Sequence, residues 1–125
     1  MSTTTITDIR TIGVTVTDQD AAVDFYVGTL GFEKILDAPI SPTMRWVEVA
    51  PNGATTSIAL VAGDGVPATA AETGIRFTVP DAVAEHTAMS GRGVTVGELL
   101  IWDGVPPMYT FDDPDGNRYI IVEAS

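Results

Sequence analysis

The chain has 125 residues, a length typical of one domain, and its hydrophobic share of 45% is enough to build a core. A formal net charge of −11 argues against sequence-independent binding to nucleic acid or to an anionic membrane, because both need Lys and Arg. The absence of cysteine excludes disulfides, thiol catalysis and cysteine-ligated zinc. No apolar run is long enough to span a membrane, and the N-terminus lacks a signal-peptide pattern, so we expect a cytoplasmic protein.

The first half of the chain predicts one helix among four strands. Alternation of β-branched residues predicts the first strand, and Asp18 is placed to cap the helix that follows. Pro39 and Pro42 predict a loop after the second strand. In chain order the expected elements are a strand at 9–17, a helix at about 20–26, a strand from Leu30-Gly31-Phe32 to about residue 36, a loop at 38–43, and strands at 44–50 and 55–62.

The second half repeats this plan after a linker rich in Ala and Gly at 63–73. Asp81 follows a strand and opens a helix, as Asp18 does in the first half. The expected elements are a strand at 75–79, a helix to about residue 90, a turn at 91–93, and strands at 94–96, near 107–111 and at 118–123. Matching phrases recur at an offset of about 63 residues, which predicts two degenerate copies of one β-α-β-β-β unit.

Several phrases resemble the vicinal oxygen chelate superfamily, which groups glyoxalase I, extradiol dioxygenases and bleomycin-resistance proteins. They are Val16-Thr17-Asp18 through Phe25-Tyr26, Leu30-Gly31-Phe32, Arg92-Gly93-Val94 and Phe111-Asp112-Asp113-Pro114-Asp115-Gly116-Asn117. The resemblance extends from about Ile9 to Glu123. It implies an α+β fold in which two tandem β-α-β-β-β modules form an incomplete barrel around a cleft. The implied single domain has one module at about 9–62 and a second at about 74–123.

The same resemblance implies where a metal site belongs. Metal-dependent members place a His at the start of each module's first strand and a Glu within each module's last strand. These positions fall on Thr11, Gly74, Ile120 and Ser57, or Ala59 if the register slips by two. None of them supplies a histidine or a carboxylate, so we expect neither the usual metal nor any other cofactor. The only histidine, His86, is expected in mid-helix, facing solvent or an interface, and Glu123 is expected to point away from the Ile120 face.

The remaining candidates are residues that could line the cleft. Met44, Trp46 and Glu48 alternate onto one face of their strand, and Trp102 flanks the corresponding strand of the second module. Aromatic walls with few polar groups suit an apolar ligand, although core packing explains such residues equally well. Arg45 suits either an anionic ligand or a surface salt bridge. The predicted ligand-binding residues are Met44, Arg45, Trp46, Glu48, Ser57, Trp102, Met108, Tyr109 and Ile120.

These observations favour a metal-independent protein that binds or sequesters a small apolar or aromatic molecule, as bleomycin-resistance-like proteins do. The alternative is a glyoxalase- or dioxygenase-like enzyme with a non-standard metal site or with cofactor-free carboxylate chemistry. For the latter, burial would have to raise the pKa of Glu48. A module devoted to protein interaction is a third possibility. The resemblance also implies a homodimer, in which two copies complete each cleft.

Overall fold

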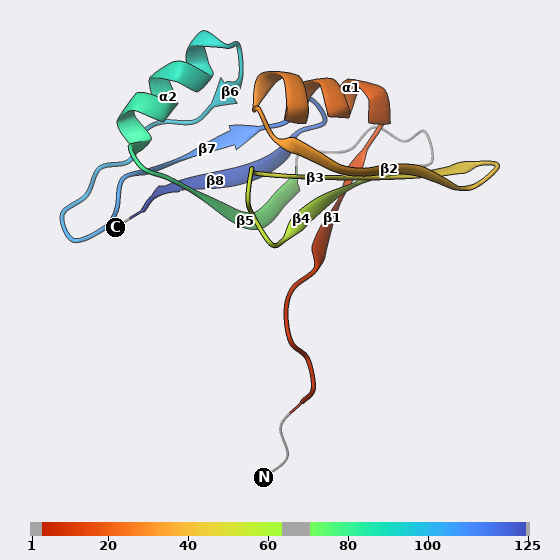
Figure 1. The fold of residues 1–125 in the computed structure, drawn as a ribbon. Helices are drawn as coiled ribbons and strands as arrows, with labels where there is room; N and C mark the ends of the chain where they lie inside the picture. The colour runs from red at the N-terminus through yellow and green to blue at the C-terminus, as the bar shows by residue number, and fades with distance from the viewer. Residues whose placement is uncertain (1–3, 64–70, 125) are drawn as a thin grey trace.

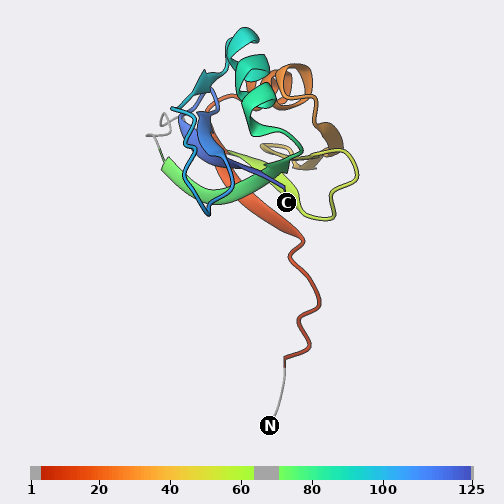
Figure 2. The ribbon, with the colours of Figure 1, turned by 90° about the vertical axis from the view of Figure 1, so that its left-hand side faces the viewer.

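The computed structural model describes residues 4–63 and 71–124 and contains two four-stranded sheets, one for each module (Figure 1). Both helical segments lie on the same side of the sheets, and the described N-terminal residues leave from the other side (Figures 1 and 2). The elements are β1 (Thr11–Val16), α1 (Gln19–Val23), the π-helix η1 (Asp24–Thr29), β2 (Glu33–Ser41), β3 (Met44–Ala50), β4 (Ser57–Ala62), β5 (Ala71–Val79), α2 (Ala82–Gly91), β6 (Thr95–Val96), β7 (Met108–Asp112) and β8 (Asn117–Glu123).

The two sheets have the same topology. The first has the order β1-β4-β3-β2 and the second the order β5-β8-β7-β6. The outer pair β1–β4 is parallel, as is β5–β8, and the other neighbours are antiparallel. A parallel pair needs a crossover connection, and each module contains one helical segment between its first two strands. The α+β fold with two tandem β-α-β-β-β modules and no closed barrel is therefore confirmed.

Strand alternation gives each sheet two different faces. On the face toward the helices, apolar side chains such as Val14, Val47 and Leu60 in the first sheet and Phe111 and Ile121 in the second form one buried core. The other face we call the open face. In the first sheet it carries Thr11, Trp46, Glu48, Ser57 and Ala59, and in the second it carries Arg76, Met108, Thr110, Ile120 and Val122.

The first module's helical segment also joins the two modules. Tyr26 in η1 is fully buried, and its hydroxyl lies 2.7 Å from Asp113 Oδ2 and 2.5 Å from the Tyr119 hydroxyl in the second module. The rings of Phe32 and Phe77 pack edge to face with their centroids 5.5 Å apart. Side chains from both modules thus contribute to one core.

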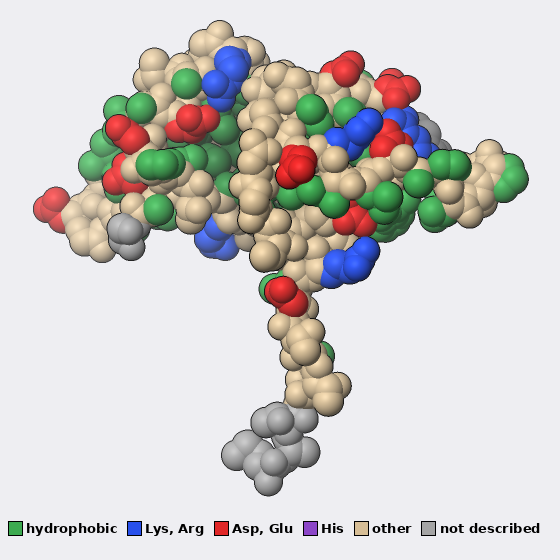
Figure 3. All heavy atoms as spheres, in the orientation of Figure 1, with side chains coloured by type: hydrophobic (Ala, Val, Ile, Leu, Met, Phe, Trp, Pro, Cys, Tyr) green, Lys and Arg blue, Asp and Glu red, His purple; other side chains and the backbone are tan. Residues whose placement is uncertain are grey.

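The structure corrects the expected loop at 38–43. Strand β2 continues through Pro39 to Ser41 and forms a protruding hairpin with β3 (Figure 1). Proline is tolerated because β2 is an edge strand whose register shifts at Pro39/Ser41. Hydrophobic side chains, including the exposed Ile40 and Met44, gather toward the tip of this hairpin (Figure 3).

Other boundaries also differ from the sequence-based expectation. The first strand begins at Thr11, and residues 4–10 form an extended, exposed arm before it (Figures 1 and 2). Most of the expected linker at 63–73 lies outside the described residues, and its last three residues belong to β5. Among the helices that the structure describes, none has the length and apolar character needed to cross a membrane.

Candidate functional site

A buried carboxylate lies on the open face of the first sheet. Glu48 is only 5% exposed, and its two oxygens accept separate hydrogen bonds. The Ser57 hydroxyl donates to Oε1 over 2.6 Å, and the indole N–H of Trp46 donates to Oε2 over 2.7 Å. Glu48 lies opposite Ala59 in the β3–β4 ladder, and the small alanine leaves room for the glutamate side chain. Strand register therefore brings these predicted residues together.

The hydrogen bonds lower the pKa of Glu48 below its usual value. The Ser57 hydroxyl has the largest effect and the Trp46 indole the next, and together they outweigh the burial that would raise this pKa. The raised pKa that cofactor-free chemistry at Glu48 would require is therefore not found, although burial by itself acts in that direction. At neutral pH the side chain is an ionised carboxylate that only accepts hydrogen bonds.

A hollow of about 440 Å³ adjoins this cluster at the base of the β2–β3 hairpin. Trp46 and Met44 form part of its wall together with two prolines, and Val61 closes it from β4. Trp46 thus lies between the hollow and Glu48. The lining residues are Gln19, Pro39, Ser41, Pro42, Thr43, Met44, Arg45, Trp46, Val61, Ala62 and Gly63.

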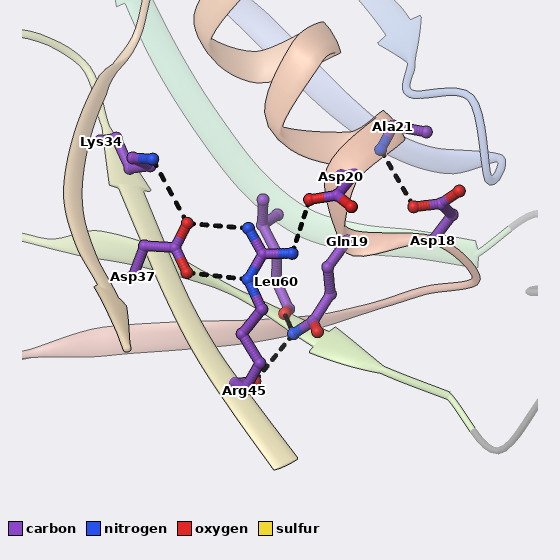
Figure 4. A network of polar contacts seen from close by, with 8 residues as sticks. All are labelled: Asp18, Gln19, Asp20, Ala21, Lys34, Asp37, Arg45 and Leu60. Carbon is purple, nitrogen blue, oxygen red and sulfur yellow. Dashed lines mark hydrogen bonds and ion pairs between the residues drawn. The ribbon is translucent and has the colours of Figure 1, made fainter. Parts of the chain in front are cut away.

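The polar edge of the hollow is a network that joins the hairpin to the start of α1 (Figure 4). The Arg45 guanidinium donates to both oxygens of Asp37 over 2.8 Å each and to Asp20 over 2.6 Å. These bonds hold the pKa of Asp37 well below its usual range. Gln19 Nε2 donates to the carbonyl oxygens of Arg45 and Leu60 over 2.9 Å each. The predicted fork of Arg45 is therefore already occupied by carboxylates of this chain.

The predicted residues of the second module line a different hollow. Met108, Thr110 and Ile120 contribute to a space of about 290 Å³ on the second sheet. Tyr109 also lines it, but its hydroxyl donates to Met89 Sδ over 3.2 Å under α2, where burial raises the pKa of Tyr109 to about 12. Trp102 lies in the loop before β7 and is 60% exposed. The predicted residues of the two modules thus line two different hollows among the residues that the structure describes.

The positions where a metal would be expected have no suitable donors. Thr11 and Ser57 are register partners in the first sheet, but the Thr11 hydroxyl donates to the Ser57 carbonyl and the Ser57 hydroxyl to Glu48. In the second sheet, Gly74 adopts a positive φ of 73° where the β5–β8 register shifts, a conformation suited to glycine, and Ile120 is apolar. Within residues 4–63 and 71–124, no three His, Cys, Asp or Glu side chains form a metal-binding group. The residues present do not fit the metal that the family implies.

The two remaining acid–base candidates lie on the helix side of the second sheet. Glu123 accepts a hydrogen bond from the Ala82 backbone N–H over 3.0 Å, so it points away from the Ile120 face, as predicted. His86 lies in mid-helix in α2, as predicted, and is half-buried. Its Nε2 lies 2.9 Å from the Gly97 carbonyl oxygen, and its ring packs against Tyr109.

The sequence-based prediction included Met44, Arg45 and Trp46 but missed the other residues of the wall: Gln19, Pro39, Ser41, Pro42, Thr43, Val61, Ala62 and Gly63. Alternation along the fourth strand places Val61 on the same face as Ser57, so a stricter count would have found it. The two prolines were interpreted only as loop formers. Nothing in the local sequence indicates that the amide of Gln19 crosses to β3 and β4.

The chain is similar to known proteins over nearly its whole length. Residues 8–121 match the Glyoxalase/Bleomycin resistance protein/Dioxygenase superfamily. YetH of Bacillus subtilis is 30% identical over 122 residues, which cover 94% of this chain and 99% of YetH. A superfamily member from Sphaerobacter thermophilus has a TM-score of 0.87 and 35% identity over 95% of this chain and 98% of its own.

TnmS3, an antibiotic binding protein from Streptomyces sp. CB03234, has a TM-score of 0.85 and 33% identity, and the match covers 98% of this chain and 100% of TnmS3. These similarities extend over both modules and include the strands that carry the Glu48 cluster. The chain therefore belongs to the Glyoxalase/Bleomycin resistance protein/Dioxygenase superfamily.

Proposed function

We propose that this protein binds and sequesters a small apolar or aromatic molecule without using a metal ion. The observation that carries the proposal is the hollow of about 440 Å³ with Trp46 and Met44 in its wall. Its volume is in the range of small-molecule sites, and such sites combine apolar or aromatic walls with a few polar groups. The similarity to TnmS3, an antibiotic binding protein, supports the same class of function.

The enzyme alternative has less support from the side chains. Cofactor-free chemistry would need a carboxyl group with a raised pKa, whereas the pKa of Glu48 is lowered. A metal-assisted reaction would need donors that Thr11, Gly74 and Ile120 do not supply. Ligand binding needs only the aromatic wall and its polar edge.

Titration of Trp46 fluorescence tests the proposal. In W102F, where Trp46 is the remaining tryptophan, uncharged polycyclic aromatic molecules should quench the emission saturably. We expect W46A to weaken binding of the best probe at least about tenfold, because stacking and apolar contact are lost, and W102A to change it less than about twofold. Equal affinity of W46A and wild type, or stoichiometric metal that binding requires, would contradict the proposal.

We further propose that the protein works as a homodimer. The two groups of predicted residues lie on separate sheets, and a second copy could bring an open face of each kind together. The exposed arm supports this arrangement, because Ile6 and Ile9 are 80% and 63% exposed. Light scattering during gel filtration of the wild type should give twice the chain mass of 13.1 kDa. The double variant I6D/I9D should give a measured mass closer to that of the monomer. A monomeric wild type at the concentration used for ligand titration would contradict the dimer. A cytoplasmic location stays a prediction.

A further inference from the structure

The hollow of about 440 Å³ lies where two neighbouring strands of the first sheet stop pairing. Among the described residues, the β3–β4 ladder ends at Glu48 and Ala59 on the side of the hairpin tip. Beyond that point, residues of both strands, including Trp46 of β3 and Val61 of β4, line the hollow. Main-chain pairing between the two strands therefore does not continue here, and their carbonyl groups need other donors.

The side-chain amide of Gln19 bridges the two strands at this place. Gln19 is the first residue of α1, and its Nε2 donates to the carbonyl oxygens of Arg45 in β3 and Leu60 in β4 over 2.9 Å each (Figure 4). Both partners are carbonyl oxygens, which only accept, so the NH₂ end of the amide must face them. The orientation of the amide is thereby fixed, and Oε1 lies on its other side.

This amide oxygen is an acceptor that the chain does not use. Within residues 4–63 and 71–124, Gln19 Oε1 accepts no hydrogen bond. No buried side-chain nitrogen or oxygen among these residues lacks a hydrogen-bond partner, so Oε1, which has none, is not buried. Gln19 also belongs to the wall of the hollow. A fixed and accessible acceptor thus stands at this wall with its lone pairs unused.

The strongest donors of the wall are already bonded within the chain. The Arg45 guanidinium pairs with Asp20 and Asp37. The Trp46 indole N–H donates to Glu48. The unused amide oxygen is uncharged, so it suits an uncharged O–H or N–H donor. An ammonium group would lose its hydration in exchange for a single neutral acceptor.

We infer that the hollow selects aromatic or apolar molecules that carry an uncharged O–H or N–H donor, with Gln19 as the specificity-determining residue. This inference rests on the proposed ligand-binding function and names its ligand class. The aromatic part packs against Trp46, and the donor at its edge bonds to Gln19 Oε1. Because both strands hold the amide, the acceptor is in place before the ligand arrives, and binding costs little ordering of this side chain.

Two quinolines of nearly the same shape test the inference: 6-hydroxyquinoline, which has an O–H donor, and 6-methoxyquinoline, which has none. Both are uncharged at pH 7. The ether is the more hydrophobic of the two, so apolar burial alone would favour it. Calorimetric titration of the wild type should instead give about fivefold tighter binding of the hydroxyl compound, the effect of one neutral hydrogen bond.

The variant Q19M keeps the length of the side chain but removes the acceptor. It should bring the two affinities within about twofold of each other or reverse their order. The ratio of the two affinities is the readout, because loss of the bridge to Arg45 and Leu60 alters the hollow for both probes alike. T43V is the matched control, because it removes a hydroxyl from another residue of the same wall, and it should keep the full preference.

A measurement on the wild type covers the case in which Q19M does not fold. At saturation, the ¹³C resonance of the Gln19 amide carbonyl should move farther downfield with 6-hydroxyquinoline than with the ether. The reason is that accepting a hydrogen bond deshields this carbon.

The outcomes separate this inference from the function on which it rests. If the wild type binds both quinolines equally, if Q19M keeps the preference, if T43V loses it as Q19M does, or if the Gln19 resonance moves equally with both probes, the inference is overturned while aromatic binding stands. If no aromatic molecule, the two quinolines included, binds near Trp46, both the inference and the proposed function are overturned.

Discussion

At the scale of single residues, the acidic turn after β7 is explained by the bonds of one side chain. Asp113 is buried, and its carboxylate accepts hydrogen bonds from the backbone N–H groups of Asp115 and Asn117 over 2.9 and 2.8 Å. It also accepts from the Asn117 amide over 2.9 Å and from the Tyr26 hydroxyl over 2.7 Å. The turn that identifies the family in the sequence is thus a structural junction between the modules.

We expect D113A to be strongly destabilising. The change leaves two backbone N–H groups and two side-chain donors without their acceptor in a buried setting, so the free energy of unfolding should fall by about 3 kcal/mol. The midpoint of thermal unfolding should fall by roughly 10 °C. Circular dichroism during heating measures it. D103A, which removes an exposed acid, is the control, and its free energy of unfolding should stay within about 0.5 kcal/mol of the wild type. A D113A variant as stable as the wild type would refute the junction role.

The pKa of Glu48 predicts a specific pH dependence. Hydrogen bonds from Ser57 and Trp46 lower this pKa in the folded protein. The carboxylate therefore stabilises the fold at any pH above 4.5, the ordinary pKa of the group. That contribution is lost as the pH falls through the lowered folded value. The difference in unfolding free energy between wild type and E48Q should therefore shrink as the pH is lowered from 7 to below 4.5. Urea unfolding at a series of pH values measures it, and a difference that grows with acidity would contradict the prediction.

Which residues share the open face could be predicted from the sequence, whereas their bonding could not. Period-two alternation put Trp46 and Glu48 on one face of β3. The family resemblance assigned Thr11 and Ser57 to the two ligand positions of the first module, which are register partners in the structure. The sign of the pKa change at Glu48 depended on donors from β3 and β4 at hydrogen-bonding distance. Burial alone favours a raised pKa, so the sequence-based argument gave the opposite direction.

At the scale of elements, both α-helices begin with the same device. Asp18 and Asp81 have extended backbones, and each side chain accepts a hydrogen bond over 3.1 Å from the backbone N–H three residues later, at Ala21 and Ala84. The cap satisfies one of the free N–H groups at the start of each helix. This feature was predictable, because it depends only on neighbours in the sequence.

We expect D81A to lower the free energy of unfolding by about 1 kcal/mol, because α2 loses its N-terminal hydrogen bond. D81N is the matched control. It removes the same charge but keeps a capping side-chain oxygen, so it should remain within a few tenths of a kcal/mol of the wild type. Urea unfolding of the three proteins measures both values. Equal losses in D81A and D81N would assign the effect to charge instead of the cap.

Two other elements depend on tertiary surroundings and escaped prediction. Strand β2 passes through Pro39 because this edge strand has no sheet neighbour on its outer side to require the missing N–H. Helix α1 continues as the π-helix η1, where the Leu30 N–H donates to the Phe25 carbonyl five residues earlier. The wider turn accompanies the burial of Tyr26 between the modules. Local propensity carries no information about either constraint.

At the scale of the whole molecule, the two modules share more than a connecting segment. The Asn117 side chain of the second module donates to the Thr15 carbonyl of the first over 2.9 Å, and Asp115 accepts from the Thr17 hydroxyl over 2.5 Å. Tyr26 adds a buried aromatic contact with Tyr119. The repeat in the sequence predicted two units but not these bonds, because they join residues about 90 positions apart or more, for which local patterns carry no signal.

These contacts predict that the modules unfold as one unit, as expected of a single domain. Loss of the second module would expose Tyr26, and loss of the first would expose Phe77 and leave Asp113 without the Tyr26 hydroxyl, so a half-folded state should be unstable. W102F reports on the first sheet through Trp46, and W46F reports on the second module through Trp102. Fluorescence of the two variants, each corrected by its own circular dichroism, should give coincident urea midpoints. Separate transitions for the two tryptophans would mean that each module is stable alone, and the shared core would then contribute little to cooperativity.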